Sequence, residues 1–164
     1  MATHRLFIRA IGFLPDTTGN VYPKPGALDG YDRFSNEILA FKDSGTRIGA
    51  VTTFLVPKNY VGTPKGYVVW SSIATTGDVV WDVDTKAVAD GESLDPSTDD
   101  DAQTVTTTTP GTARLRKDST VTFSGTYAAD DEVLVSVYRD GVQAADTLAA
   151  EALFEGFIFE FADA

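Results

Sequence analysis

The sequence predicts an all-β protein, an antiparallel jelly-roll sandwich of about eight to ten strands. Two observations predict this class. Short segments in which apolar and polar residues alternate recur along most of the chain, separated by Gly, Pro and Asp. No segment has the helical periodicity of an element that would cover a parallel sheet. The 164 residues fit one domain, and 43% hydrophobic residues suffice for a core.

The first element is a predicted strand from His4 to Phe13. A Pro- and Gly-rich passage follows, from Leu14 to Asp32, and it lacks the periodicity of a packed element. We therefore divide the chain into residues 1–32, a strand with an extended arm, and residues 33–164, the jelly-roll domain. Either the arm packs on a neighbouring copy, or it is a surface loop whose strand lies in the same sheet. The sequence leaves both open.

The remaining strands follow at short, regular intervals. Their predicted ranges are Glu37–Lys42, Arg47–Val56, Gly66–Ala74, Val79–Val83, Gln103–Thr109, Ser119–Ser124, Glu132–Arg139 and Phe154–Phe161. The turn Thr75–Asp78 predicts that the strands on either side of it pair as a hairpin. Alternation places Trp70 and Trp81 in the core, and Asp82 and Asp84 outside it.

The composition excludes several kinds of chemistry. Cysteine is absent, which excludes disulfides, thiolate nucleophiles and Cys-ligated metals. His4 is the only histidine, so a multi-histidine metal site is excluded too. Carboxylate pairs such as Asp82 with Glu132, or Asp84 with Glu160, are equally easy to choose, and nothing singles out one of them. We predict no enzymatic activity.

Charge is spread unevenly along the chain. The whole sequence has 24 acidic residues against 13 Lys and Arg, for a net charge of −11. Residues 1–74 hold 8 basic and 5 acidic residues, whereas residues 75–164 hold 5 and 19. Without a basic cluster, a nucleic-acid partner is not expected. Without an apolar run of about 20 residues, a membrane-spanning segment is not expected.

Two groups of residues are candidates for ligand binding. Asp95, Asp99 and Asp101 are weak candidates for a Ca²⁺ site, because Ca²⁺ takes carboxylate ligands; a solvated acidic loop is the alternative. No other cofactor is expected. Tyr31, Tyr60 and Tyr67 lie in or beside loops and are candidates for stacking on a sugar ring.

A buried or half-buried ion pair is a further possibility. Arg139, Asp140 and Asp146 flank an otherwise apolar turn. A bidentate Arg–Asp pair would pin this turn to the sandwich; an exposed pair of little energetic value is the alternative.

Six segments resemble jelly-roll structural proteins of tailed-bacteriophage virions. They are Phe54–Tyr60, Val69–Ala74, Gly77–Val83, Gly91–Asp95, Val137–Asp140 and Ala144–Leu148. The resemblance implies a capsid decoration or cement protein that stabilises the head as a homo-oligomer, often a trimer. Its partners would be the major capsid protein and copies of itself. It would be made in the host cytoplasm and located on the capsid surface of the virion.

In this interpretation the N-terminal segment attaches the protein to its partner. The candidate partner-binding residues are Arg5, Arg9, Tyr22, Lys24, Tyr31 and Arg33. The alternative function is a carbohydrate-binding or host-receptor-binding jelly-roll module of a tail or fibre.

Overall fold

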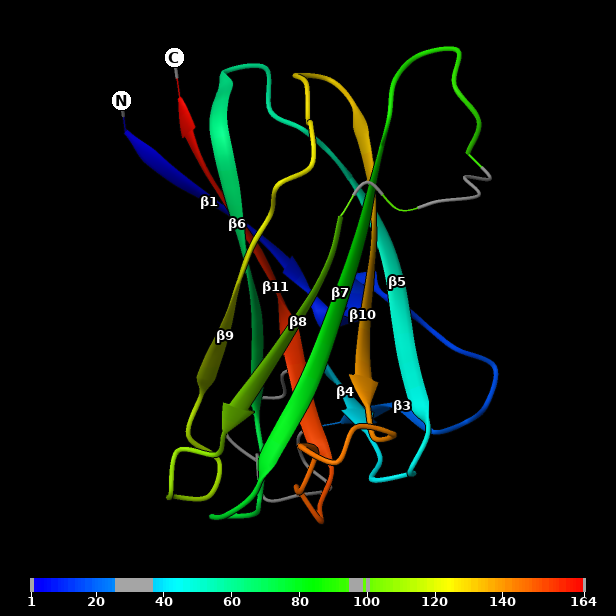
Figure 1. The fold of residues 1–164 in the computed structure, drawn as a ribbon, viewed down its shortest axis with the longest axis vertical. Coiled ribbons are helices and arrows are strands. Elements are labelled where there is room, and N and C mark those ends of the chain that lie inside the picture. Colours follow the sequence, from blue (N-terminus) through cyan, green and yellow to red (C-terminus); the bar gives the residue numbers. More distant parts are fainter. Residues whose placement is uncertain (1, 26–36, 95–98, 100, 164) are drawn as a thin grey trace.

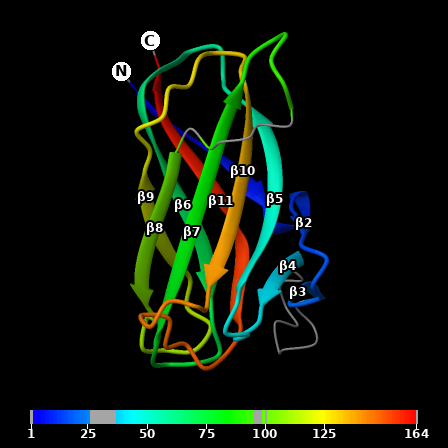
Figure 2. The same cartoon turned by 45° about the vertical axis from the view of Figure 1, so that its right-hand side comes forward.

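The computed structural model describes residues 2–25, 37–94, 99 and 101–163. Within them, two antiparallel sheets pack face to face (Figures 1 and 2), which confirms the predicted jelly-roll sandwich. The strands are β1 (Thr3–Arg9), β2 (Leu14–Pro15), β3 (Val21–Pro25), β4 (Glu37–Phe41), β5 (Arg47–Leu55), β6 (Tyr60–Ser71), β7 (Asp78–Val88), β8 (Asp101–Thr108), β9 (Lys117–Thr122), β10 (Glu132–Asp140) and β11 (Ala152–Asp163). A single 3₁₀ turn in this part of the chain, η1 (Ala10–Gly12), joins β1 to β2.

One sheet has six strands and the other has five. The six-stranded sheet has the order β3-β4-β11-β6-β9, and β1 also pairs with β11. The five-stranded sheet has the order β2-β5-β10-β7-β8. The two termini lie side by side at one end of the sandwich, where β7 ends and β10 begins (Figure 1).

The described part of the N-terminal segment belongs to these two sheets. β1 pairs with β11 from Thr3, opposite Ala162, to Arg9, opposite Gly156. β2 pairs with β5 and β3 pairs with β4, so the passage predicted to lack packed elements contains two strands. The first strand therefore lies in a sheet of its own chain, and packing of the arm on a neighbouring copy stays a prediction. Residues 26–36, which contain the proposed boundary at residue 32, lie outside the described residues, and that boundary stays a prediction.

The predicted hairpin around Thr75–Asp78 is wrong. β6 lies between β11 and β9 in one sheet, and β7 lies between β10 and β8 in the other. The physical reason is the core: Trp70 on β6 and Trp81 on β7 are both fully buried, and their ring centroids lie 6.0 Å apart. Two large rings on neighbouring strands of one sheet would share a face, whereas strands in opposite sheets let both rings fill the space between the layers.

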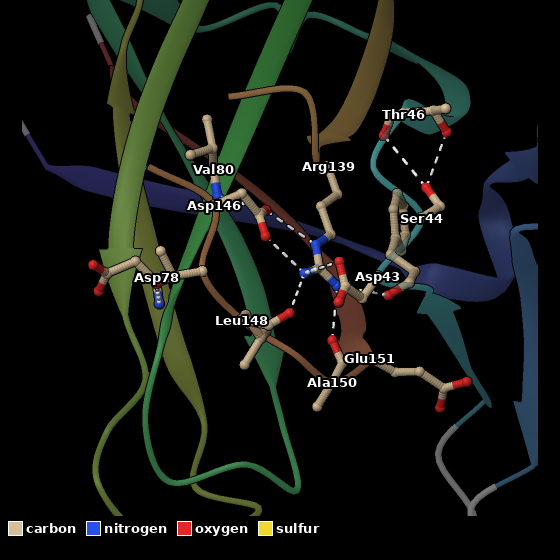
Figure 3. Close-up of polar contacts among 12 residues, drawn as sticks. Asp43, Ser44, Thr46, Asp78, Val80, Arg139, Asp146, Leu148, Ala150 and Glu151 are labelled. Carbon is tan, nitrogen blue, oxygen red and sulfur yellow. Dashed lines mark hydrogen bonds and ion pairs between the residues drawn. The ribbon is translucent and has the colours of Figure 1, made fainter. Parts of the chain in front are cut away.

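Arg139 lies in the core beneath the connection from β10 to β11 (Figure 3). Its Nε and Nη2 donate to the two carboxylate oxygens of Asp146, at 3.0 and 2.7 Å. The remaining donors reach the carbonyl oxygens of Leu148, Ala150 and Phe41. The buried Arg–Asp pair predicted to pin this turn is thus present, with Asp146 as the partner.

No helix in the described residues is long and apolar enough to cross a membrane.

Candidate functional site on the outer face of the five-stranded sheet

The outward side chains of β2, β5, β10 and β7 form one continuous surface, here called the outer face. Its layout follows from the strand register. One row across the sheet runs Leu14, Val51, Ser136, Asp84, and it passes from apolar to charged. The next rows toward the loop end place Thr53, Leu134 and Lys86 side by side, and then Leu55, Glu132 and Val88. Antiparallel pairing brings these residues together from four separate segments.

A shallow groove of about 490 Å³ lies over the first two rows. Its outward-facing lining consists of aliphatic and hydroxyl side chains. It is lined by Gly12, Leu14, Val51, Thr52, Thr53, Leu134, Val135 and Ser136. We call it the sheet groove. An apolar floor with a few hydroxyls suits a ligand that has both apolar and hydrogen-bonding surfaces.

A second groove, of about 320 Å³, continues from the last row onto the connecting loops. It combines four carboxylates with exposed leucines. It is lined by Leu55, Val88, Ala89, Asp90, Gly91, Glu92, Leu94, Asp130 and Glu132. We call it the loop groove. It contains no Lys or Arg among its lining residues.

Apolar side chains are unusually exposed along both grooves. The described part of the chain exposes nine large apolar residues, and four of these line the two grooves. Leu14, Leu55 and Leu94 are 73, 64 and 65% exposed, and Val51 is 43% exposed. Exposed apolar residues that gather along one surface indicate a binding surface, whereas scattered ones do not.

A charged cluster borders the sheet groove. The Arg47 guanidinium carbon lies 3.6 Å from the centroid of the Tyr138 ring. Arg47 Nε donates to Asp82 Oδ2 at 3.0 Å, and Nη2 donates to Asp84 Oδ2 at 2.6 Å. Thr104 Oγ1 donates to Asp82 Oδ1 at 2.7 Å. Gly49, opposite Tyr138, makes this packing possible, because a Cβ there would lie 2.2 Å from Tyr138 Cδ1.

Ionisation in this cluster follows from burial and from its neighbours. Burial raises the pKa of Asp84; Arg47 opposes that shift, and the nearby carboxylates of Asp99 and Asp82 add to it. Burial lowers the pKa of Arg47, but its hydrogen bonds to Asp84 and Asp82 outweigh burial and leave the pKa raised. Arg47 therefore stays charged, with two carboxylates as its counter-ions.

The predicted Ca²⁺ ligands are not brought together in the described residues. Asp101 is 6% exposed, and its carboxylate accepts hydrogen bonds from Gln103 Nε2 at 2.5 Å, from Gly125 N at 3.0 Å and from Ser124 N. Asp99 is exposed, and Asp95 lies outside the described residues. No group of three or more His, Asp or Glu in this part of the chain is arranged to hold a metal ion. The Ca²⁺ site stays a prediction.

The predicted partner-binding residues that the structure describes lie on the opposite sheet. Arg5 Nε donates to Glu160 Oε2 at 2.7 Å, and Arg9 is exposed at the end of β1. Tyr22 and Lys24 both donate to the Glu151 carboxylate. Tyr31 and Arg33 lie outside the described residues. Binding of a partner by this set stays a prediction.

Two of the tyrosines considered for sugar stacking also lie away from the grooves. Tyr67 donates to Glu160 Oε1 at 2.9 Å, and Arg5 lies over its ring, 5.0 Å from the centroid. The Tyr60 ring contacts Phe159 and Phe161. Tyr31 lies outside the described residues.

Sequence reasoning missed the residues that form the outer face. Arg47, Val51, Leu134, Ser136 and Tyr138 were assigned only to strands. A signal was present: both Arg47–Leu55 and Glu132–Asp140 have large apolar residues at inward and outward positions alike. A strand with one solvated face is expected to alternate apolar with polar residues, so apolar residues on both faces indicate a second contact surface.

No protein-family model and no curated protein matches this sequence. Solved structures do match the fold. A family 35 carbohydrate-binding module, solved with a disaccharide containing glucuronic acid, has a TM-score of 0.57 at 12% identity, over 97% of this chain and 98% of that one. A family 6 module from Clostridium cellulolyticum in complex with xylose has a TM-score of 0.51 at 13% identity, over 95% of both chains. The CBM22-1 xylan-binding domain of Paenibacillus barcinonensis gives 0.52 at 12%, over 99% and 94%.

The chain therefore has a two-sheet β-sandwich fold of the jelly-roll type found in carbohydrate-binding modules. The resemblance to bacteriophage virion proteins is wrong, because the structural neighbours that cover nearly the whole chain are carbohydrate-binding modules. Capsid decoration and a capsid-protein partner are wrong with it. Where the structure describes them, the segments that carried the resemblance are strands and turns of a sandwich, which unrelated jelly rolls share for reasons of packing. Location on the capsid surface stays a prediction.

Proposed function

We propose that this protein is a non-catalytic module that binds a carbohydrate chain along the outer face of its five-stranded sheet. The observation that carries the proposal is the pair of adjoining grooves along β5 and β10, where exposed aliphatic side chains lie beside hydroxyls and charged groups. The fold supports the same function, since modules of this fold have been solved with xylose and with a uronic-acid disaccharide.

The surface matches the chemistry of a sugar ring. A pyranose presents C–H groups on its faces and hydroxyls around its rim. Leu14, Val51 and Leu134 provide aliphatic contact for the faces, and Ser136 and Thr53 provide donors and acceptors for the rim. Hydroxyls that lose water on binding must find such partners, because an unpaired buried polar group costs about 1–3 kcal/mol.

The length of the surface favours an extended chain over a single ring. From Glu132 to Tyr138 the site follows seven residues of β10, and the six steps between them span about 20 Å at the rise of a β-strand. The loop groove then extends the surface beyond Glu132. An oligosaccharide is therefore expected to bind more tightly than its monosaccharide.

The two carboxylate pairs considered from the sequence lack the spacing that glycoside hydrolysis needs. Asp82 pairs with Tyr138 in the register, so it lies about 20 Å along the sheet from Glu132. Glu160 lies on the other sheet from Asp84. Glycoside hydrolysis needs two carboxyl groups about 5–9.5 Å apart, and neither of the pairs considered from the sequence meets this condition.

Affinity gel electrophoresis with soluble polysaccharides tests this proposal. We expect at least one of xylan, a β-glucan, a galactan or a mannan to retard the protein. Leu134→Ala and Ser136→Ala should each weaken retardation about fivefold, which corresponds to about 1 kcal/mol for a lost contact or hydrogen bond.

The matched control is Thr120→Ala, an exposed change on the outward side of β9 in the other sheet. It should leave retardation unchanged. If retardation persists in Leu134→Ala and Ser136→Ala but disappears in Thr120→Ala, the glycan binds on the six-stranded sheet and the proposed site is wrong. Thermal melting of all three variants checks that they remain folded.

A further inference from the structure

We infer that the outer-face site selects neutral glycan chains and rejects chains that carry carboxylates, such as uronic-acid polymers. This inference rests on the proposed function, because it concerns the ligand class of the same surface. It follows from how the positive charges on this face are already engaged, and from how many carboxylates surround them.

The guanidinium of Arg47 is the group on this face best suited to bind an anionic sugar. It is also the group least available to do so, since its Nε and Nη2 are held by Asp82 and Asp84, and one face of the guanidinium lies on the Tyr138 ring. A guanidinium with two carboxylate partners presents no net positive charge to a third. Binding a uronate here would require breaking one of these two bonds.

The other cation does not change this balance. Lys86 lies beside Leu134 in the register, and it is not free, because it has an interaction of its own. The loop groove adds four carboxylates and no Lys or Arg. Carboxylates therefore outnumber cations along the described grooves and in the Arg47 cluster. The cations are Arg47 and Lys86, and the six carboxylates are those of Asp82, Asp84, Asp90, Glu92, Asp130 and Glu132.

Asp84 has further carboxylates as neighbours. Burial raises the pKa of Asp84, Arg47 lowers it, and the neighbouring carboxylates of Asp99 and Asp82 raise it further. A uronate bound on this face would add one more carboxylate to those of Asp82, Asp84 and the loop groove, and like charges brought together at a binding surface weaken binding. A neutral chain does not meet this cost.

Paired polysaccharides of one backbone type test the inference. The probes are hydroxyethyl cellulose against carboxymethyl cellulose, arabinoxylan against glucuronoxylan, and fully methyl-esterified polygalacturonan against polygalacturonan, each measured by affinity electrophoresis. For the pair whose neutral member binds, we expect that member to bind about tenfold or more tightly at low salt. The difference should shrink at high salt, because salt screens exposed charges.

Charge-neutralising variants separate local from overall charge. Asp84→Asn leaves Arg47 with one carboxylate partner, so it should improve binding of the anionic member severalfold relative to the neutral one. Asp118→Asn, on β9 of the other sheet, makes the same change in net charge and should leave the ratio unchanged. If Asp118→Asn shifts the ratio as much as Asp84→Asn, the local account is wrong.

The outcomes distinguish the inference from the function on which it rests. Tighter binding of a neutral member, with a ratio that shifts in Asp84→Asn, supports the inference. Equal or tighter binding of an anionic member overturns the inference and leaves carbohydrate binding intact. If no member of any pair binds and no polysaccharide of the wider panel retards the protein, the proposed function fails, and the inference fails with it.

Discussion

Arg139 is fully buried, and each nitrogen of its guanidinium donates at least one hydrogen bond. Asp146, itself nearly buried, takes two of its hydrogen bonds, and carbonyls from the β10–β11 connection and from β4 take the others. A buried cation of this kind is stable only while these partners hold it. The side chain therefore joins the connection between β10 and β11 to both sheets.

Replacing Arg139 tests this role. Arg139→Met should lower the free energy of unfolding by about 3–5 kcal/mol, because it leaves the Asp146 carboxylate buried without its counter-ion. The double variant Arg139→Met with Asp146→Leu should lose less than the sum of the two single changes, since neither charge then remains. Urea denaturation measures all three. Additive losses would mean that the two residues stabilise the fold independently.

Asp101, a candidate Ca²⁺ ligand in the sequence, has a structural role in the fold. Its carboxylate is held by backbone N–H groups of Ser124 and Gly125 and by Gln103, and so it ties the start of β8 to the chain after β9. Burial opposes the charge, but these hydrogen bonds outweigh burial and lower the pKa of Asp101. The ionised form is therefore the one that stabilises the fold.

Asp101→Asn should make stability less dependent on acid. Because the folded-state pKa lies below the unfolded value of about 3.9, the contribution of Asp101 is complete above that value and is lost as the pH falls through the folded pKa. At neutral pH, Asp101→Asn should cost about 1–3 kcal/mol. The gap between the native protein and the variant should close toward pH 2. Denaturation between pH 7 and 2 measures it, with Thr120→Ala, an exposed change on the other sheet, as the control.

At the scale of elements, the pairing of β5 with β10 builds most of the outer face. Gly49 on β5 lies opposite Tyr138 on β10, and the absence of a side chain there lets the Tyr138 ring lie against the sheet and support Arg47. A glycine within a strand ordinarily weakens it, so its presence here is explained by the approach of this ring.

Gly49→Ala should disturb stability and binding together. The added Cβ would lie 2.2 Å from Tyr138 Cδ1, so the ring must move and Arg47 must move with it. We expect a loss of about 1–3 kcal/mol in unfolding free energy, typical of overpacking, and weaker glycan retardation. In the double variant Gly49→Ala with Tyr138→Ala, stability should recover in part and retardation should not. Recovery of both would show that Tyr138 has no part in binding.

At the scale of the whole molecule, the fold determines where the unevenly distributed charges lie. Arg47 comes from the part of the chain with a net positive charge, and the six carboxylates along the grooves come from the part with 19 acidic residues. The fold brings the two parts onto one face. Acidic residues from the second half of the sequence therefore contribute most of the negative charge at the candidate site.

The local pattern of residues determined the class of fold. Alternation with period two, frequent turns and the lack of helical spacing were enough to predict a sandwich, and the inward rows with Trp70 and Trp81 were assigned to the core that they occupy. These features depend only on neighbours in the sequence. The positions of Arg139, Asp140 and Asp146 beside one turn also made a buried Arg–Asp pair one of the two alternatives stated from the sequence, and the structure shows it with Asp146.

Only the tertiary structure decided which strands are neighbours, and with that, where the candidate site lies. Alternation shows that Val51, Ser136 and Asp84 share the property of facing outward, but it does not show that they form one row, since they are distant in sequence. The same limit produced the wrong hairpin and the wrong family, because turns and strands look alike in every jelly roll. The sequence determines which face each side chain takes within its own strand. The pairing of strands depends on burying both tryptophans and the Arg139 network at once, and that is a property of the folded molecule.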